Sequence, residues 1–112
     1  MNDNAFVDFV MDQLKDLGAV RSRSMFGGFG LYRGDVFFAI VYEGGLYFKT
    51  DASSAPRYRR EGMKAFRPRP GQVLKTYYQV PVDVLENDAR LVEWARDAVL
   101  AAAGTRPPAK KG

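Results

Sequence analysis

Short glycine-rich turns divide the stretch between Val20 and Thr50, and they restrict the fold more than any other feature of this chain. The turns fall at 27–28, 34–35 and 43–45. The segments between them are rich in β-branched and aromatic residues, which predicts strands over 20–26, 29–33, 36–42 and 46–50. Such turns join only antiparallel neighbours, because parallel strands need a crossover of about a dozen residues. The sequence therefore predicts an antiparallel sheet.

The composition of two of these segments indicates their place in the sheet. Residues 36–42 are almost continuously apolar, which is typical of a central strand, whereas the polar segment 20–26 is typical of an edge strand. A further strand is predicted over 73–80, and Pro81 ends it.

Helical patterns precede and follow the predicted sheet. At the start, an amphipathic helix with Asp3 or Asn4 as cap and Gly18 as stop is predicted from the spacing of Phe6, Phe9, Val10, Leu14 and Leu17. A short helix is predicted between Asp51 and Gly62, with Ser53 or Ser54 as cap and Pro56 in its first turn. Residues 63–72 are expected to be irregular or to contain a short strand.

The C-terminal part predicts two more helices. Asp83 and Glu86 resemble a capping box that opens a short helix, and Asn87 or Asp88 is expected to cap the last one. The apolar side of that last helix includes Leu91, Trp94, Ala95, Ala98 and Val99. The fold class is therefore α+β, as one domain over 1–103 followed by a flexible basic tail over 104–112.

Composition narrows the chemistry. The 112 residues include no Cys and no His, which excludes disulfides, thiol nucleophiles, imidazole bases and the usual zinc sites. The acids near turns, such as Asp35 and Glu43, form no calcium-loop motif. We therefore expect no enzyme activity, no metal and no cofactor. No signal peptide and no membrane-spanning run is evident, so a cytoplasmic location is expected.

The glycine-rich motif around residue 28 is interpreted as structural. Its members are Met25, Phe26, Gly27, Gly28 and Gly30. A phosphate-binding loop would need a helix N-terminus beside it, and here strands are predicted on both sides. A bulge or a close approach of another backbone is the better interpretation.

A cluster of cations after the predicted sheet is the main candidate binding site. It consists of Arg57, Tyr58, Arg59, Arg60, Lys64, Arg67 and Arg69. Arginines could pair with phosphates while Tyr58 stacks on a base, or the cluster could meet an acidic protein surface. It could equally be a solvated helix face with Tyr58 buried, in which Arg57 pairs with Glu61 or with the acidic helices of the same chain or of a second copy.

Five segments in order resemble the N-terminal domain of the TfoX/Sxy family of bacterial competence regulators. They are 23–32 (RSMFGGFGLY), 46–51 (LYFKTD), Gly62 and Met63 with Phe66, 77–81 (YYQVP) and 91–95 (LVEWA). The resemblance implies two layers, with the N-terminal and C-terminal helices on one face of the antiparallel sheet. It also implies a role in transcriptional regulation, where the fuller proteins have a second, C-terminal domain and act with the cAMP receptor protein.

Two functions follow as hypotheses. The first is a non-enzymatic, stand-alone module that binds a protein of the transcription machinery through the sheet face or the basic segment, with a homodimer as a further alternative. The second is direct nucleic-acid binding through the basic segment at 57–69 and the basic tail.

Overall fold

The structure is a computed structural model that describes residues 3–25 and 27–104. The predicted tail therefore lies outside the described residues, apart from its first residue, and so does Phe26 of the glycine-rich motif. In chain order the elements are α1 (Asp3–Gln13), β1 (Val20–Met25), β2 (Gly28–Arg33), β3 (Val36–Tyr42), β4 (Gly45–Lys49), α2 (Ala55–Arg60), β5 (Ala65–Arg69), β6 (Gln72–Gln79), α3 (Val82–Leu85) and α4 (Asp88–Ala103).

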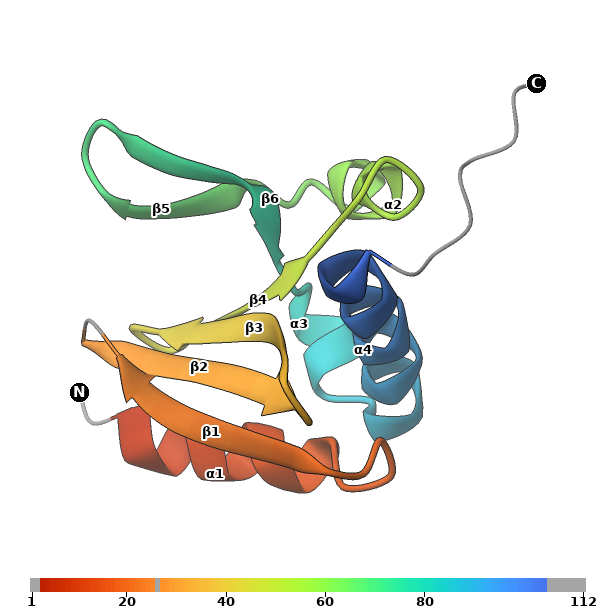
Figure 1. Cartoon of the computed structure of the whole chain (residues 1–112). Coiled ribbons are helices and arrows are strands. Elements are labelled where there is room, and N and C mark those ends of the chain that lie inside the picture. Colours follow the sequence, from red (N-terminus) through yellow and green to blue (C-terminus); the bar gives the residue numbers. More distant parts are fainter. Residues whose placement is uncertain (1–2, 26, 105–112) are drawn as a thin grey trace.

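The strands form one antiparallel sheet in the order β1-β2-β3-β4-β6-β5 (Figure 1). The prediction of an antiparallel sheet is confirmed, with β1 at one edge and β3 inside. The short turns impose the order of the first four strands, because β1, β2 and β3 each pair with the strand that follows. The chain departs from it only after β4, where α2 intervenes and β6 rather than β5 pairs with β4.

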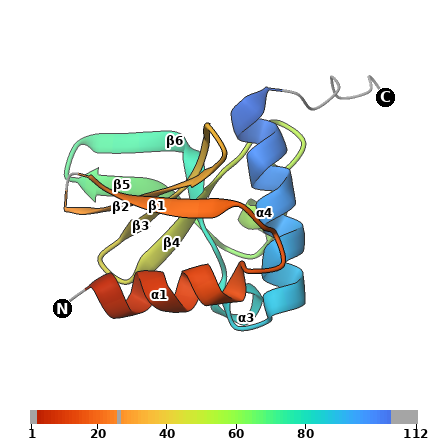
Figure 2. The same cartoon turned by 60° about the horizontal axis from the view of Figure 1, so that its bottom comes forward.

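The helices α1, α3 and α4 cover one face of the sheet (Figure 2), so the predicted two-layer α+β fold is confirmed. Helix α4 packs against β3 and β4, and α1 packs against β3. The core between the layers contains Val7, Val10, Leu14, Leu31, Phe38, Ala39, Val41, Leu46, Phe48, Val84, Leu91, Trp94, Ala95 and Ala98.

Helix α1 is rotated relative to the predicted apolar stripe. Val7 is buried, whereas the side chain of Phe9 is 41% exposed and its ring lies 6.4 Å from that of Phe6 at the rim of the core. The helix includes Asp3, so Asp3 and Asn4 do not precede it as caps. Gly18, with φ at 80°, follows the last turn as predicted.

The predicted caps of the other three helices have different outcomes. Helix α3 begins at Val82 after Pro81, so Asp83 lies inside it; the Asp83 carboxylate instead pairs with Arg90 at 3.1 Å. Ser54 occupies the N-cap position of α2, as predicted, but makes no side-chain cap bond; its hydroxyl oxygen accepts from the amide of Asp51 at 3.1 Å and its proton is donated to the Asp51 carboxylate at 3.2 Å. Asn87 caps α4 as predicted, and its side-chain oxygen accepts from the amide of Arg90 at 3.1 Å.

The segment expected to be irregular or to hold a short strand contains β5. It forms a hairpin with β6, and Figure 1 shows this hairpin extending away from the helices. Among the described residues, no helix is long and apolar enough to cross a membrane.

Candidate binding face of the sheet

The two faces of the sheet are occupied differently. Residues directly opposite each other on paired strands point to the same face, so the pairs Leu31–Ala39 and Val41–Leu46 belong to the core side. The pair Tyr32–Phe37 points to the other side. None of the three core helices covers that second face, which we call the open face.

A bulge in β3 decides which phenylalanine lies on the open face. The register of β2 and β3 shifts between Leu31 and Tyr32, so that Phe38 is an extra residue between the pairs at Ala39 and Phe37. The Phe38 side chain is fully buried in the core, whereas Phe37 points to the open face. The consecutive residues Phe38 and Ala39 thus both face the core, as a β-bulge permits, and Phe37 rather than Phe38 lies on the open face.

Gly28 and Gly30 bring the strands and side chains of the open face close together. A β-carbon on Gly28 would lie 2.2 Å from the carbonyl oxygen of Val41, and one on Gly30 would lie 2.8 Å from the side chain of Met25 and 2.9 Å from that of Phe37. The glycines therefore permit close packing, and β2 rather than a helix follows the motif. Their interpretation as structural residues agrees with this geometry.

A row of three partly buried rings crosses the open face. The centroids of Tyr32 and Phe37 are 5.2 Å apart and those of Phe37 and Tyr77 are 5.9 Å apart. We call Tyr32, Phe37 and Tyr77 the ring row. Burial, and secondarily the nearby Tyr32, raise the pKa of Tyr77, so its hydroxyl keeps its proton at neutral pH and can donate a hydrogen bond.

Cations lie at both ends of the ring row. The guanidinium carbons of Arg21 and Arg23 lie 5.2 and 5.9 Å from the centroid of Tyr32. The ammonium nitrogen of Lys49 lies 5.3 Å from the centroid of Tyr77 and donates to the hydroxyl of Thr76 at 2.9 Å. These distances are within the range of cation–π attraction.

A second aromatic group joins the β5–β6 hairpin to β3 and β4. The ring of Phe66 lies 4.4 Å from that of Tyr47 and 5.4 Å from that of Tyr42, whose hydroxyl donates to the carbonyl of Pro68 at 3.4 Å. Beside these rings is a cavity of about 220 Å³, lined by Tyr42, Phe66, Pro68, Arg69, Gln72 and Leu74. The hairpin is therefore held onto the same side of the sheet as the ring row.

Acidic charge is segregated from the sheet, whereas the helices carry charges of both signs. None of the six strands that the structure describes contains Asp or Glu, whereas together they contain Arg21, Arg23, Arg33, Lys49, Arg67, Arg69 and Lys75. All the acidic side chains belong to helices, turns and loops. The open face is therefore suited to a negatively charged ligand.

The predicted basic cluster is divided by the fold. Arg57 forms an ion pair with Asp97 on α4 at 2.6 Å, and its guanidinium carbon lies 4.2 Å from the centroid of Trp94. Tyr58 is 1% exposed and packs edge-on against Trp94 at 4.8 Å. These two residues fasten α2 to the core, and the Tyr58 ring has no free face for a base. The predicted Arg57–Glu61 pair is replaced by the alternative pairing with an acidic helix.

The remaining members of the cluster are dispersed. Arg59 donates to the hydroxyl of Tyr78 at 3.2 Å, and Arg60 and Lys64 are exposed on and beside α2. Arg67 and Arg69 are exposed on β5, and Arg69 lines the cavity beside Phe66. The structure thus brings Arg69, but not Arg57 or Tyr58, to the open face.

Sequence reasoning did not identify the ring row or its flanking cations. Arg21, Arg23, Tyr32 and Tyr77 all fall in predicted strands, without an indication of the face to which they point. The complete absence of acids from the strands was a usable signal, because it can be counted as soon as the strands are assigned. The pairing of β4 with β6, which places Tyr77 in the row, has no comparable signal.

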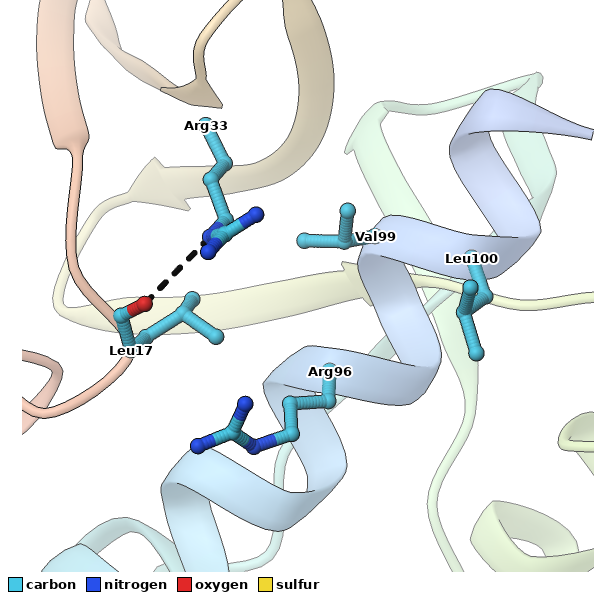
Figure 3. Close-up of a pocket in the computed structure, with 5 residues that line it drawn as sticks. All are labelled: Leu17, Arg33, Arg96, Val99 and Leu100. Carbon is cyan, nitrogen blue, oxygen red and sulfur yellow. Dashed lines mark hydrogen bonds between the residues drawn. The ribbon is translucent and has the colours of Figure 1, made fainter. Parts of the chain in front are cut away.

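A cavity of about 240 Å³ lies where the end of α1, β2 and α4 meet (Figure 3). It is lined by Leu17, Arg33, Arg96, Val99 and Leu100. The Nε of Arg33 donates to the carbonyls of Leu17 at 3.3 Å and Gly18 at 3.2 Å. Arg33 therefore holds the connection from α1 to β1.

Comparison with known proteins agrees with the resemblance seen in the sequence. The profile of the TfoX N-terminal domain family matches residues 12–102. A similar protein is "DNA transformation protein TfoX1" of Aliivibrio fischeri, which is 35% identical over 65 residues. That match covers 58% of this chain and 29% of the relative, so the chain matches less than a third of the relative's length. Since the family profile spans most of the chain, this protein belongs to the TfoX N-terminal domain family.

Proposed function

We propose that this chain is a non-enzymatic binding module that acts in transcriptional regulation and holds a negatively charged macromolecular partner on the open face of its sheet. The observation that carries the proposal is the charge segregation. An aromatic face with Arg21, Arg23 and Lys49 lies in a sheet whose strands contain no acid, while the opposite side carries helices that include Asp and Glu.

The non-enzymatic part of the proposal is supported by the residues present. Without His and Cys, acid–base or nucleophilic catalysis would depend on carboxylates, Lys or Tyr. Tyr77 has its pKa raised, which opposes a role as a base at neutral pH. The regulatory part is supported by membership of the family and by the similarity to a protein named for DNA transformation.

The proposal is tested by transcript profiling in the organism that encodes the chain. A deletion strain is complemented with the unaltered gene, with an Arg21→Gln/Arg23→Gln variant, or with a matched Arg60→Gln/Lys64→Gln variant. The matched variant removes the same charge from exposed positions outside the open face. We expect the deletion and the Arg21/Arg23 variant to change the same transcripts, and the matched variant to restore them. An Arg21/Arg23 variant that restores every transcript would contradict the proposal.

A further inference from the structure

The ring row and its cations select among negatively charged partners. The ligand must present flat apolar groups to Tyr32, Phe37 and Tyr77, and negative charges to Arg21, Arg23 and Lys49. Single-stranded nucleic acid has this composition in every residue, since each nucleotide joins a planar base to a phosphate.

The cations of the face retain donors for such a ligand. Within the described residues, the ion pairs involve Arg57 with Asp97 and Arg90 with Asp83, so neither includes a cation of the open face. Arg21 makes one long bond, from its Nη2 to the carbonyl of Gly34 at 3.4 Å. Within the described part of the chain, the guanidinium groups of Arg21 and Arg23 therefore lie near the ring of Tyr32 and belong to neither of these ion pairs.

Other partners use only part of this surface. A duplex hides its bases in the stack, so it would engage the cations and leave the ring row unused. An acidic peptide supplies charges but not a regular series of planar groups. A second copy paired face to face would bring Arg21, Arg23 and Lys49 against cations of the same kind.

We propose that the open face binds single-stranded nucleic acid, with bases stacked at Tyr32, Phe37 and Tyr77 and phosphates held by Arg21, Arg23 and Lys49. This inference rests on the proposed function, because both use the same face. It replaces the basic segment at 57–69 as the route to nucleic acid, since Arg57 and Tyr58 are engaged inside the fold. Because stacking accepts any base, we expect little sequence preference.

The test compares ligands with equal charge and different bases. The whole chain is titrated, by fluorescence anisotropy at low salt, into labelled oligothymidine of about 12 nucleotides, a length within the range of known single-strand sites. The same backbone without bases, a duplex of equal length and a polyglutamate peptide are the comparison ligands. We expect oligothymidine to bind at least about tenfold more tightly than the abasic strand, and its affinity to fall steeply with salt.

Variants separate stacking from charge. Tyr32→Leu/Tyr77→Leu keeps apolar volume but removes the rings. It should lower the affinity for oligothymidine at least about tenfold and leave the affinity for the abasic strand unchanged. Arg21→Gln/Arg23→Gln should lower the affinity for both oligothymidine and the abasic oligonucleotide. The matched Arg60→Gln/Lys64→Gln variant should lower both affinities less. If the ring variant fails to fold by circular dichroism, amide chemical shifts of the unaltered chain should move in β1, β2, β3 and β6 rather than in α2.

The outcomes distinguish the two proposals. Equal binding of oligothymidine and the abasic strand, or tighter binding of the duplex, would overturn base stacking and leave the binding of an anionic partner intact. Binding of polyglutamate without oligothymidine would assign the face to an acidic protein. Binding of none of these anions would contradict both the inference and the proposed function.

Discussion

Gly28 opens β2 at a point where another backbone leaves no room for a side chain. A β-carbon there would lie 2.2 Å from the carbonyl oxygen of Val41, whereas the nearest neighbour of one at Gly30 is the flexible end of Met25 at 2.8 Å. We therefore expect Gly28→Ala to lower the free energy of unfolding by about 1–3 kcal/mol, the usual range for overpacking. Gly30→Ala should cost less, because the side chains of Met25 and Phe37 that it would meet can shift more readily than a backbone carbonyl, and alanine restricts the unfolded chain. Urea unfolding of both variants measures the difference in stability. Equal losses of stability would show that the contact with the Val41 carbonyl does not determine the cost at Gly28.

Single residues also show where sequence reasoning succeeds and fails. The structural interpretation of Gly28 was available because glycine has few other uses between two strands. It was not predictable that Phe38 and not Phe37 faces the core, because a bulge shifts the two-residue period without changing the composition. The same limit applies to Phe9, since both Val7 and Phe9 fit an apolar stripe and only the docking of α1 decides between them.

At the scale of elements, Arg57 connects α2 to α4. Its guanidinium pairs with Asp97 at 2.6 Å and lies over Trp94, while its Nε is buried without a hydrogen-bond partner in the described part of the chain. We expect Arg57→Ala to lower the free energy of unfolding by about 1–2 kcal/mol, from the lost ion pair and cation–π contact. Arg60→Ala, an exposed change on the same helix, should stay within about 0.5 kcal/mol of the unaltered chain. Similar losses for the two variants in urea unfolding would contradict this role.

Elements were predictable where local chemistry defines them. Glycine turns set the first four strands, and the Asn87 cap sets the start of α4. The start of α3 was mispredicted because Pro81, with its extended backbone, can precede a helix as well as end a strand. A strand over the β5 segment was predicted only as an alternative to irregular structure, since Pro68 argues against a strand. Pro68 is tolerated because β5 lies at the edge of the sheet, where a missing amide donor disrupts no ladder.

At the scale of the whole molecule, residues that are close in the sequence are separated in space, and residues far apart in the sequence are brought together. The cluster 57–69 is dense in sequence, yet the fold directs its members to the core, to α2 and to the hairpin. The open face gathers residues as distant as Arg21 and Tyr77, which no local window brings together. The fold class was therefore predictable from local signals, whereas the candidate site depends on pairings between strands far apart in the chain.

Burial of Tyr58 gives the whole molecule a predictable response to alkali. Burial raises the pKa of Tyr58 above the ordinary tyrosine value near 10, and Asp97 adds to this while Arg57 opposes it. The folded chain keeps this proton at pH values where the unfolded chain loses it. The contribution of Tyr58 to the free energy of unfolding is therefore complete below about pH 10. As the pH rises further this contribution is lost, at up to about 1.4 kcal/mol per pH unit for one group.

Tyr58→Phe isolates this effect, because phenylalanine keeps the ring packed against Trp94 and cannot ionise. In urea unfolding between about pH 8 and pH 11, we expect the variant to lose stability less steeply above pH 10 than the unaltered chain. Some slope should remain, since burial also raises the pKa of Tyr47 and Tyr77. Parallel curves for the two proteins would mean that Tyr58 ionises as easily in the folded chain as in the unfolded one, and that α2 does not shield it from water.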